Sequence, residues 1–344
     1  ILDKQMRPEN NPHNLNLIFS NDPMLKGCFA YDEFANRLVI KKAPAWRREG
    51  DSLEFKDIDD AYIRSYFATA YGIKGKESLM DALDIEAYKS GFHPVRAYLE
   101  GLTWDGVPRI EWLFNAFLGA ENSEYTREVS RKWFTAAVAR VFKPGIKFDN
   151  MIIFVGEEGI GKSTLISKLA GEWFSDTSID LRNKKDAMED LQGVWVMEWA
   201  ELTSFRTASV EAVKAFVSKF FDRFRPAYGR RVEKFPRQCI FMGSTNISDF
   251  LSDPTGNRRF WPILTKVVPI AADVHTQLTE EIRAQIWAEA VAMFRSGEPL
   301  NLSPEVVAIA RNVQQAHTEI DDRLALIDAF VNAEVPVNWY KMNE

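Results

Sequence analysis

The chain has 344 residues, of which 46% are hydrophobic and 27% are charged, and its formal net charge at pH 7 is −6. This is the composition of a globular protein, and no apolar run approaches the roughly 18 residues that a membrane span needs. Two cysteines and four histidines are too few for a disulfide framework or a thiolate zinc site. The acidic balance restricts nucleic-acid contact to a local basic feature, and without a basic-then-apolar leader we expect a cytoplasmic protein. The sequence starts at Ile1 rather than Met, which leaves open that it is a piece of a longer chain.

The first region, residues 1–145, is predicted to be a mainly helical N-terminal domain. Apolar side chains recur at helical spacing in residues 57–71, 79–88, 95–99 and 125–142. The run Lys143-Pro144-Gly145 ends the last of these helices, and we place the domain boundary there. Three tryptophans lie at core-like spacing and are expected to be packed inside: Trp104, Trp112 and Trp287.

The second region, residues 146–270, alternates apolar runs with helical segments, which is typical of a parallel α/β sheet. Its predicted strands are residues 151–155, 194–198 and 238–244, and their near-continuous apolar character indicates burial on both faces. The third region, residues 271–344, is predicted to be a helical segment, with helices over residues 280–294 and after Ser303. The fold class is therefore α/β with helical regions on either side.

A phosphate-binding pattern follows the first predicted strand. The pattern Gly-x4-Gly-Lys-Ser needs glycines so that the backbone can wrap phosphates with its amides pointing inward. Lys162 would reach the β- and γ-phosphates of ATP, and the Ser163 hydroxyl would take a position on Mg²⁺. The predicted nucleotide-binding residues are Gly156, Glu157, Glu158, Gly159, Ile160, Gly161, Lys162, Ser163 and Thr164. A glycine-rich turn without function is the alternative, but the flanking strand and helix favour an ATPase P-loop.

Two acidic residues lie at the end of the second predicted strand. Glu198 follows the apolar run Val-Trp-Val-Met, at the strand end where ligands of open α/β sheets collect, and Glu201 comes three positions later. Hydrolysis needs a carboxylate near Mg²⁺ and another group to orient water. We assign Glu198 to the metal and Glu201 to the water, and the reverse assignment stays open. Both could instead be solvated loop acids.

A local basic stretch interrupts the otherwise acidic chain. Residues 222–237 carry six basic side chains against two acids, with a Tyr-Gly pair midway that favours a hairpin turn. A basic hairpin can grip a phosphate backbone without reading its sequence. We therefore predict that Arg230, Arg231 and Lys234 bind single-stranded DNA, and an ordinary solvated hairpin is the alternative.

Two further polar features follow the third predicted strand. Asn246 ends that strand and could hydrogen-bond the γ-phosphate or the attacking water, although asparagine is also a common turn residue. Arg258 and Arg259 stand beside a Gly-Asn turn and before bulky apolar residues. Arginine fingers stabilise transition-state charge strongly, so either arginine could serve a neighbouring subunit's phosphate. Local salt bridges at the surface are the alternative for this pair.

The order of these motifs resembles the superfamily-3 helicases, a branch of the AAA+ ATPases. Several runs are closer still to the virulence-associated E family of phage and mobile-element P-loop ATPases. The similar runs are His93-Pro94-Val95-Arg96 with Tyr98-Leu99, Trp104-Asp105-Gly106-Val107-Pro108-Arg109, Ala139-Arg140-Val141 before Pro144-Gly145, Asp222-Arg223-Phe224-Arg225-Pro226 with Tyr228-Gly229-Arg230, and residues 253–262. The resemblance covers about residues 90–300.

This resemblance implies an AAA+-type core in a homo-oligomeric ring, a hexamer, that acts as an ATP-driven motor on single-stranded DNA in phage or mobile-element replication. It supports Lys162 and Ser163 for nucleotide binding, Glu198 and Glu201 for hydrolysis, Asn246 as a γ-phosphate sensor, and Arg258 or Arg259 as a finger in trans. In one departure the acids are split as Glu-Trp-Ala-Glu rather than adjacent, so their two roles stay open. Residues 1–90 hold no cluster for primase chemistry, so a primase domain would lie upstream of Ile1, and other replication proteins are possible partners.

The leading function is thus ATP hydrolysis coupled to movement along DNA, with ATP and Mg²⁺ as ligands. One rival is a P-loop kinase for a nucleotide or small molecule, which would act as a monomer. The other is a nucleotide-dependent scaffold or switch that does not translocate. DNA-stimulated ATPase activity separates the three.

Overall fold

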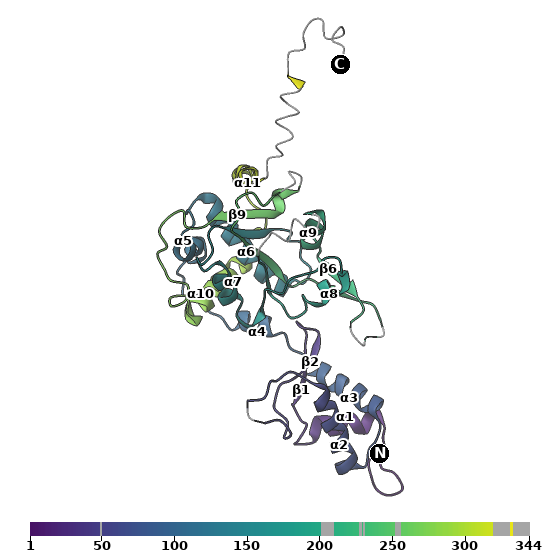
Figure 1. Ribbon diagram of the computed structural model, residues 1–344. Helices are drawn as coiled ribbons and strands as arrows, with labels where there is room; N and C mark the ends of the chain where they lie inside the picture. The colour runs from purple at the N-terminus through teal and green to yellow at the C-terminus, as the bar shows by residue number, and fades with distance from the viewer. Residues whose placement is uncertain are drawn as a thin grey trace, which may run out of the picture. The chain divides into compact units, whose positions relative to one another are not determined.

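The computed structural model describes residues 1–48, 50–200, 210–226, 229, 231–251, 256–318 and 331–332. The chain forms two compact units, whose elements are labelled in Figure 1. The first comprises Ile1–Thr103 with Met188–Trp195, and the second comprises Trp104–Ala187 with Val196–Glu344. Within the described ranges, no helix is both long enough and apolar enough to cross a membrane.

The first unit packs helices against a short hairpin. Its elements are α1 (Pro12–Asn21), β1 (Phe29–Asp32), β2 (Arg37–Ile40), α2 (Asp57–Tyr66), the π-helical turn η1 (Phe67–Tyr71), α3 (Lys76–Lys89) and α4 (Pro94–Glu100). α1 begins where the Asn11 side chain accepts a hydrogen bond from the Asn14 amide, so an exposed helix end is capped. β1 and β2 pair antiparallel, and Phe19, Phe67 and Leu79 are fully buried in the core. The helices predicted over residues 57–71, 79–88 and 95–99 are confirmed.

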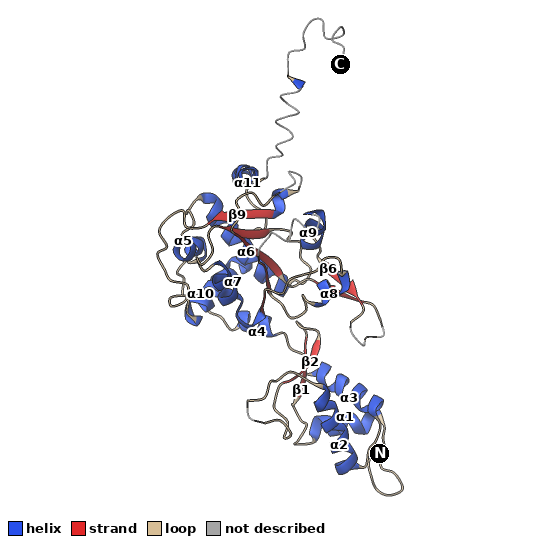
Figure 2. Ribbon diagram, in the orientation of Figure 1, coloured by secondary structure: helices blue, strands red, loops and turns tan. Residues whose placement is uncertain are grey.

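The second unit is built on a five-stranded sheet with the strand order β4-β5-β8-β3-β9 (Figure 2). Its strands are β3 (Met151–Val155), β4 (Phe174–Ser175), β5 (Val196–Trp199), β8 (Ile240–Thr245) and β9 (Phe260–Leu264). All neighbours pair parallel. Every residue of β3, β5 and β8 is buried, as expected for central parallel strands covered on both faces. The predicted parallel α/β sheet is therefore present.

Helices and short turns connect the strands of this sheet and flank them in sequence, and several pack against it. They are α5 (Leu113–Leu118), α6 (Glu124–Phe142), α7 (Lys162–Ala170), α8 (Lys184–Glu189), α9 (Val210–Val217), α10 (Glu280–Arg295) and α11 (Pro304–Ala316), together with the 3₁₀ turns η2 (Ile110–Trp112), η3 (Gly171–Trp173) and η5 (Asn257–Arg259). The helices predicted over residues 125–142 and 280–294 correspond to α6 and α10. α11 begins at the predicted point, where the Ser303 hydroxyl accepts a hydrogen bond from the Val306 amide.

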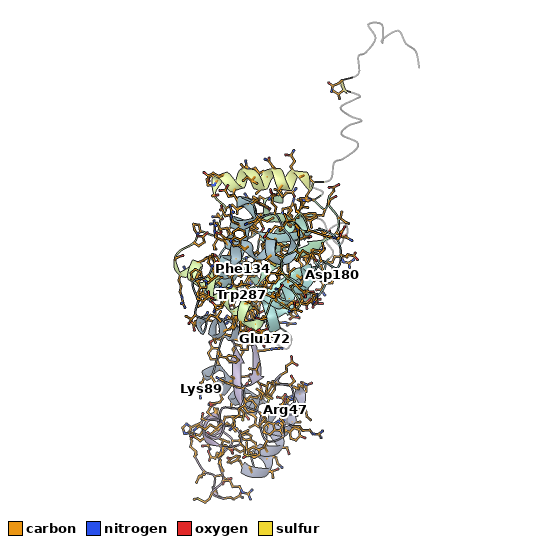
Figure 3. All side chains as sticks on the ribbon, turned by 90° about the vertical axis from the view of Figure 1, so that its left-hand side faces the viewer. Arg47, Lys89, Phe134, Glu172, Asp180 and Trp287 are labelled. Carbon is orange, nitrogen blue, oxygen red and sulfur yellow. The ribbon has the colours of Figure 1, made fainter. Side chains whose placement is uncertain are left out.

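α6 packs with the sheet rather than with the first unit. The indole nitrogen of Trp133 donates a hydrogen bond to the carbonyl of Phe241 in β8 at 2.9 Å. The rings of Phe134 and Trp287 lie 5.1 Å apart between α6 and α10 (Figure 3). The compact units consequently divide at Thr103, whereas we expected a boundary near residue 145. Trp287 is fully buried as predicted, but the expectation was wrong for Trp104 and Trp112, which are 37% and 52% exposed.

A two-stranded hairpin projects from the second unit between α9 and β8. It consists of β6 (Phe221–Phe224) and β7 (Glu233–Pro236), which pair antiparallel with Phe221 opposite Pro236. A buried ion pair fixes its base, because the Arg237 guanidinium donates to both carboxylate oxygens of Asp222 at 2.7 and 3.0 Å. The predicted basic hairpin therefore exists and starts from a rigid point.

Candidate active site

The glycine-rich loop joins the carboxyl end of β3 to α7. Gly161 has a φ of 93° and precedes the first residue of α7, Lys162. A Cβ atom at Gly161 would lie 2.8 Å from the Val274 side chain, and one at Gly156 would lie 2.1 Å from the Thr265 hydroxyl. Larger residues at these positions would strain the loop, so the observed backbone path depends on glycine.

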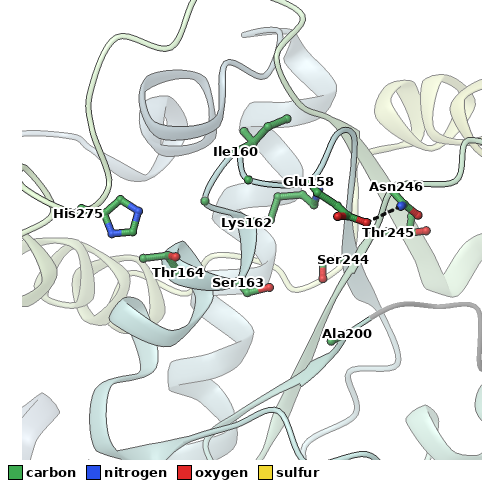
Figure 4. A pocket seen from close by; sticks show the side chains of 12 residues that line it. Glu158, Ile160, Lys162, Ser163, Thr164, Ala200, Ser244, Thr245, Asn246 and His275 are labelled. Atoms are coloured by element: carbon green, nitrogen blue, oxygen red, sulfur yellow. Dashed lines mark hydrogen bonds between the residues drawn. The ribbon is translucent and has the colours of Figure 1, made fainter.

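The loop borders a cavity of about 380 Å³ (Figure 4). The cavity lies at the carboxyl ends of β3, β5 and β8, the edge where open α/β sheets bind ligands. It is lined by Glu158, Gly159, Ile160, Gly161, Lys162, Ser163, Thr164, Ala200, Ser244, Thr245, Asn246 and His275. The amino end of α7 also opens here, and its free amides and dipole favour an anion.

Lys162 is held inside the loop. Its ammonium group donates to the carbonyls of Gly156 and Glu157, each at 2.6 Å. Burial lowers the pKa of Lys162, and the negative charges of Glu158 and Glu198 partly oppose this shift. A cation thus faces the cavity, held by carbonyl groups that a ligand phosphate can replace.

Glu198 forms a buried hydrogen-bonded group with two serines. The hydroxyls of Ser163 and Ser244 both donate to Glu198 Oε1, at 2.7 and 2.8 Å. The residue is only 2% exposed, and this burial raises the pKa of the carboxyl group, an effect that the two hydroxyl donors partly offset. The strand order explains the contact, because β8 lies between β3 and β5.

The oxygen atoms of Glu198 and its two serine partners are of the kind that magnesium binds. Mg²⁺ prefers oxygen ligands and is usually bound by one or two protein groups together with phosphate oxygens and water. Ser163 and Glu198 offer a hydroxyl and a carboxylate in direct contact. In the part of the chain that the structure describes, no cluster of three or more histidine, cysteine or acidic side chains is arranged to hold a metal by itself.

Asn246 follows β8 and borders the same cavity. Its amide nitrogen donates to Glu158 Oε1 at 2.9 Å, the contact drawn as a dashed line in Figure 4. The backbone repeats this link, because the Gly156 amide donates to the Thr245 carbonyl at 3.0 Å. The loop and the end of β8 are therefore joined at two points.

The arginine pair lies at the amino edge of the sheet, the end at which its parallel strands begin. η5 contains Arg258 and Arg259 and leads into β9, whose first residue Phe260 pairs with Met151 at the start of β3. The glycine-rich loop leaves the opposite end of β3, about 13 Å away at roughly 3.3 Å per residue. The structure thus does not bring the arginine pair to the cavity of its own chain.

The two arginines differ in how they are held. Arg259 Nε donates to the Ser218 hydroxyl at 2.6 Å, and Asp149 lies 3.9 Å away. The Arg258 side chain is exposed and lines a second cavity of about 800 Å³, to which Lys147 and Arg311 also contribute. Arg259 is fixed within its own chain, whereas Arg258 faces outward.

Of the predicted DNA-binding residues, Arg231 and Lys234 lie on the hairpin and are exposed. The Lys234 ammonium group lies 4.1 Å from the centre of the Phe221 ring, which orients it by a cation–π contact. Arg230 and the proposed water-activating Glu201 lie outside the described residues.

Four residues that line the cavity were not predicted from the sequence: Ala200, Ser244, Thr245 and His275. Ser244 was visible in the Ser-Thr-Asn end of its strand, but its bond to Glu198 depends on strand order. His275 enters from the segment before α10, and no local pattern marked it.

Known proteins resemble this chain in family and in fold. Residues 99–319, more than half of the chain, match the model of the virulence-associated protein E-like domain. None of the curated proteins matches the chain. The A-form apo structure of the NrS-1 C-terminal region (305–718) has a TM-score of 0.51 at 13% identity, over 96% of this chain and 85% of that one. A second apo structure of that region has a TM-score of 0.49 at 13% identity, over 95% and 76%. The likeness to the A-form apo structure concerns the fold alone.

Proposed function

The chain belongs to the virulence-associated protein E-like domain family, and we propose that it is an ATPase of the AAA+ superfamily-3 type that moves along single-stranded DNA. Phage or mobile-element replication is the proposed setting. The observation that carries the proposal is the cavity lined by Lys162, Ser163 and Asn246 at one end of the sheet, with Glu198 hydrogen-bonded to Ser163 beside it. These residues come from three segments of the chain and supply groups that ATP hydrolysis requires.

Each side chain has a distinct role in the proposed reaction. Lys162 binds the β- and γ-phosphates, and its charge offsets the charge that develops on them. Ser163 and Glu198 hold Mg²⁺, which when bound neutralises phosphate charge. Asn246 orients the terminal phosphate or the attacking water, supported by its position at the end of β8, directly beside the P-loop strand. Glu201 remains our choice for activating water.

The position of Arg258 supports a site completed by a neighbouring subunit. Arg258 is exposed at the amino edge of the sheet and is separated from its own P-loop by the length of β3. An arginine so placed is too far away to contact a phosphate bound at the P-loop of its own chain. We therefore propose a homo-oligomeric ring in which Arg258 is the finger and Arg259 positions η5.

The basic hairpin is the proposed contact with DNA. Arg231 and Lys234 are exposed on an element whose base is fixed by the Asp222–Arg237 ion pair. In a ring, such hairpins can surround one strand and bind its phosphates without base contacts.

The test is the ATPase rate of the purified chain with and without single-stranded DNA, measured with particle size in a non-hydrolysable nucleotide. We expect DNA to raise the rate and nucleotide to promote a ring. A monomer that phosphorylates a small acceptor would identify a kinase. Nucleotide binding with no hydrolysis under any condition would identify a switch, and no binding at all would overturn the proposal.

A further inference from the structure

The second variable residue of the P-loop, Glu158, faces the groups that are proposed to receive the terminal phosphate. Its carboxylate accepts a hydrogen bond from Asn246 at 2.9 Å, and its charge acts on Lys162. Glu157 stands next to it in the chain but points elsewhere, since its carboxylate pairs with Lys266 at 2.6 Å. Only Glu158 of the two lines the cavity.

A carboxylate is a partial mimic of a phosphate group. Both are anionic oxygen acceptors, and both form charge-assisted hydrogen bonds with amide and ammonium donors. In the described structure Asn246 already has such an acceptor in Glu158, and Lys162 is bound by two loop carbonyls. The donors intended for a terminal phosphate are therefore occupied by the protein itself.

We propose that Glu158 is a latch that sets the preference of the site between nucleoside triphosphate and nucleoside diphosphate. Its carboxylate binds Asn246 when no terminal phosphate is present, and a triphosphate has to displace it. A diphosphate has no group that competes for Asn246, so it binds without opening the latch. The latch rests on the proposed function and adds a regulatory residue to it: after hydrolysis, Glu158 returns to Asn246 and opposes rebinding of phosphate.

Equilibrium binding by calorimetry tests this on the full chain. The ligands are ADP and the non-hydrolysable imido analogue of ATP, both with Mg²⁺. Glu158→Ala removes the latch, and Glu157→Ala is the matched control, because it removes the same charge from the neighbouring position. For Glu158→Ala we expect the ratio of the ADP dissociation constant to that of the ATP analogue to rise about fivefold, the size of one exposed charged contact. For Glu157→Ala the ratio stays at the wild-type value.

A second pair of variants asks whether the effect passes through Asn246. In an Asn246→Ala background the partner of the latch is missing, so adding Glu158→Ala should not change the ratio further. Equal ratios for Glu158→Ala and the wild type, or an equal rise in the Glu157→Ala control, would overturn the latch while leaving nucleotide binding intact. A wild-type chain that binds neither ligand would instead overturn the proposed function.

Discussion

The two edges of the parallel sheet differ in how their charged side chains are held. At the carboxyl edge, Lys162 and Glu198 are buried and hydrogen-bonded to neighbours within the same unit. At the amino edge, Arg259 is anchored to Ser218 but Arg258 is exposed. One edge thus forms an enclosed site, and the other presents a cation outward. In the proposed ring, a complete site would combine the carboxyl edge of one chain with the amino edge of its neighbour.

Removing the cation of the enclosed edge should have the largest effect. Lys162→Ala deprives the phosphates of their fixed counter-charge, so we expect ATP turnover to fall at least about a thousandfold. Steady-state phosphate release measures this. Lys143→Ala, at a surface lysine of the same unit that does not line the cavity, serves as the control. Equal rates for Lys162→Ala and the wild type would remove the basis of the proposed site.

Removing the outward cation should be nearly as severe. Arg258→Ala is expected to lower turnover about a thousandfold while nucleotide affinity changes little, because a finger acts on transition-state charge. Mixing Arg258→Ala subunits with Lys162→Ala subunits should restore part of the activity, since an intact carboxyl edge then meets an intact amino edge. Mixtures that co-assemble yet stay inactive would show that each site is completed within one chain.

Glu198→Gln should change ATP turnover and thermal stability in opposite directions. The amide loses the charge that would hold Mg²⁺, so we expect turnover to fall about a hundredfold. Burial raises the pKa of Glu198, which means that the ionised carboxylate destabilises the fold at neutral pH. The variant should therefore unfold at a higher temperature than the wild type at pH 7.

The pH dependence of that difference has a definite sign. As pH falls through the raised pKa of Glu198, the wild-type carboxyl takes up a proton in the folded state and regains stability. The gap in melting temperature between wild type and Glu198→Gln should close on acidification. A gap that widened instead would contradict the assigned cause of the pKa shift. If Glu198→Gln keeps its turnover while Glu201→Gln traps ATP, Glu201 carries the essential role.

Part of the enclosed edge could be predicted from short stretches of sequence. The glycine-rich loop is contiguous in sequence, and its glycine spacing directly expresses a backbone requirement. The Ser244–Glu198 bond joins residues 46 positions apart and requires that β8 lie beside β5, which no local pattern encodes. Likewise, the run after α6 marks the end of a helix but not of a unit, because Trp133 reaches a carbonyl 108 positions away.

The amino edge was harder to interpret from sequence. The Gly-Asn turn and the two arginines were visible, but parallel pairing of β9 with β3 decides that they lie away from the P-loop. The difference between the arginines depends on Ser218, a contact across 41 positions. Long-range packing rather than residue type therefore distinguishes Arg258 from Arg259.

The smallest expected effect concerns the hairpin, which begins shortly after Ser218, the residue that holds Arg259 at the amino edge. Variants in the hairpin test whether it binds DNA. Each phosphate contact releases counterions, so losing one should lower the slope of log affinity against log salt by about 0.7 on single strands. We expect this change for Arg231→Ala and again for Lys234→Ala, whose ammonium group Phe221 orients. Titrations of single-stranded DNA at several salt concentrations measure it, with Lys26→Ala as a control at an exposed lysine of the first unit. Both hairpin slopes remaining at the wild-type value would place DNA elsewhere and leave the hairpin a solvated turn.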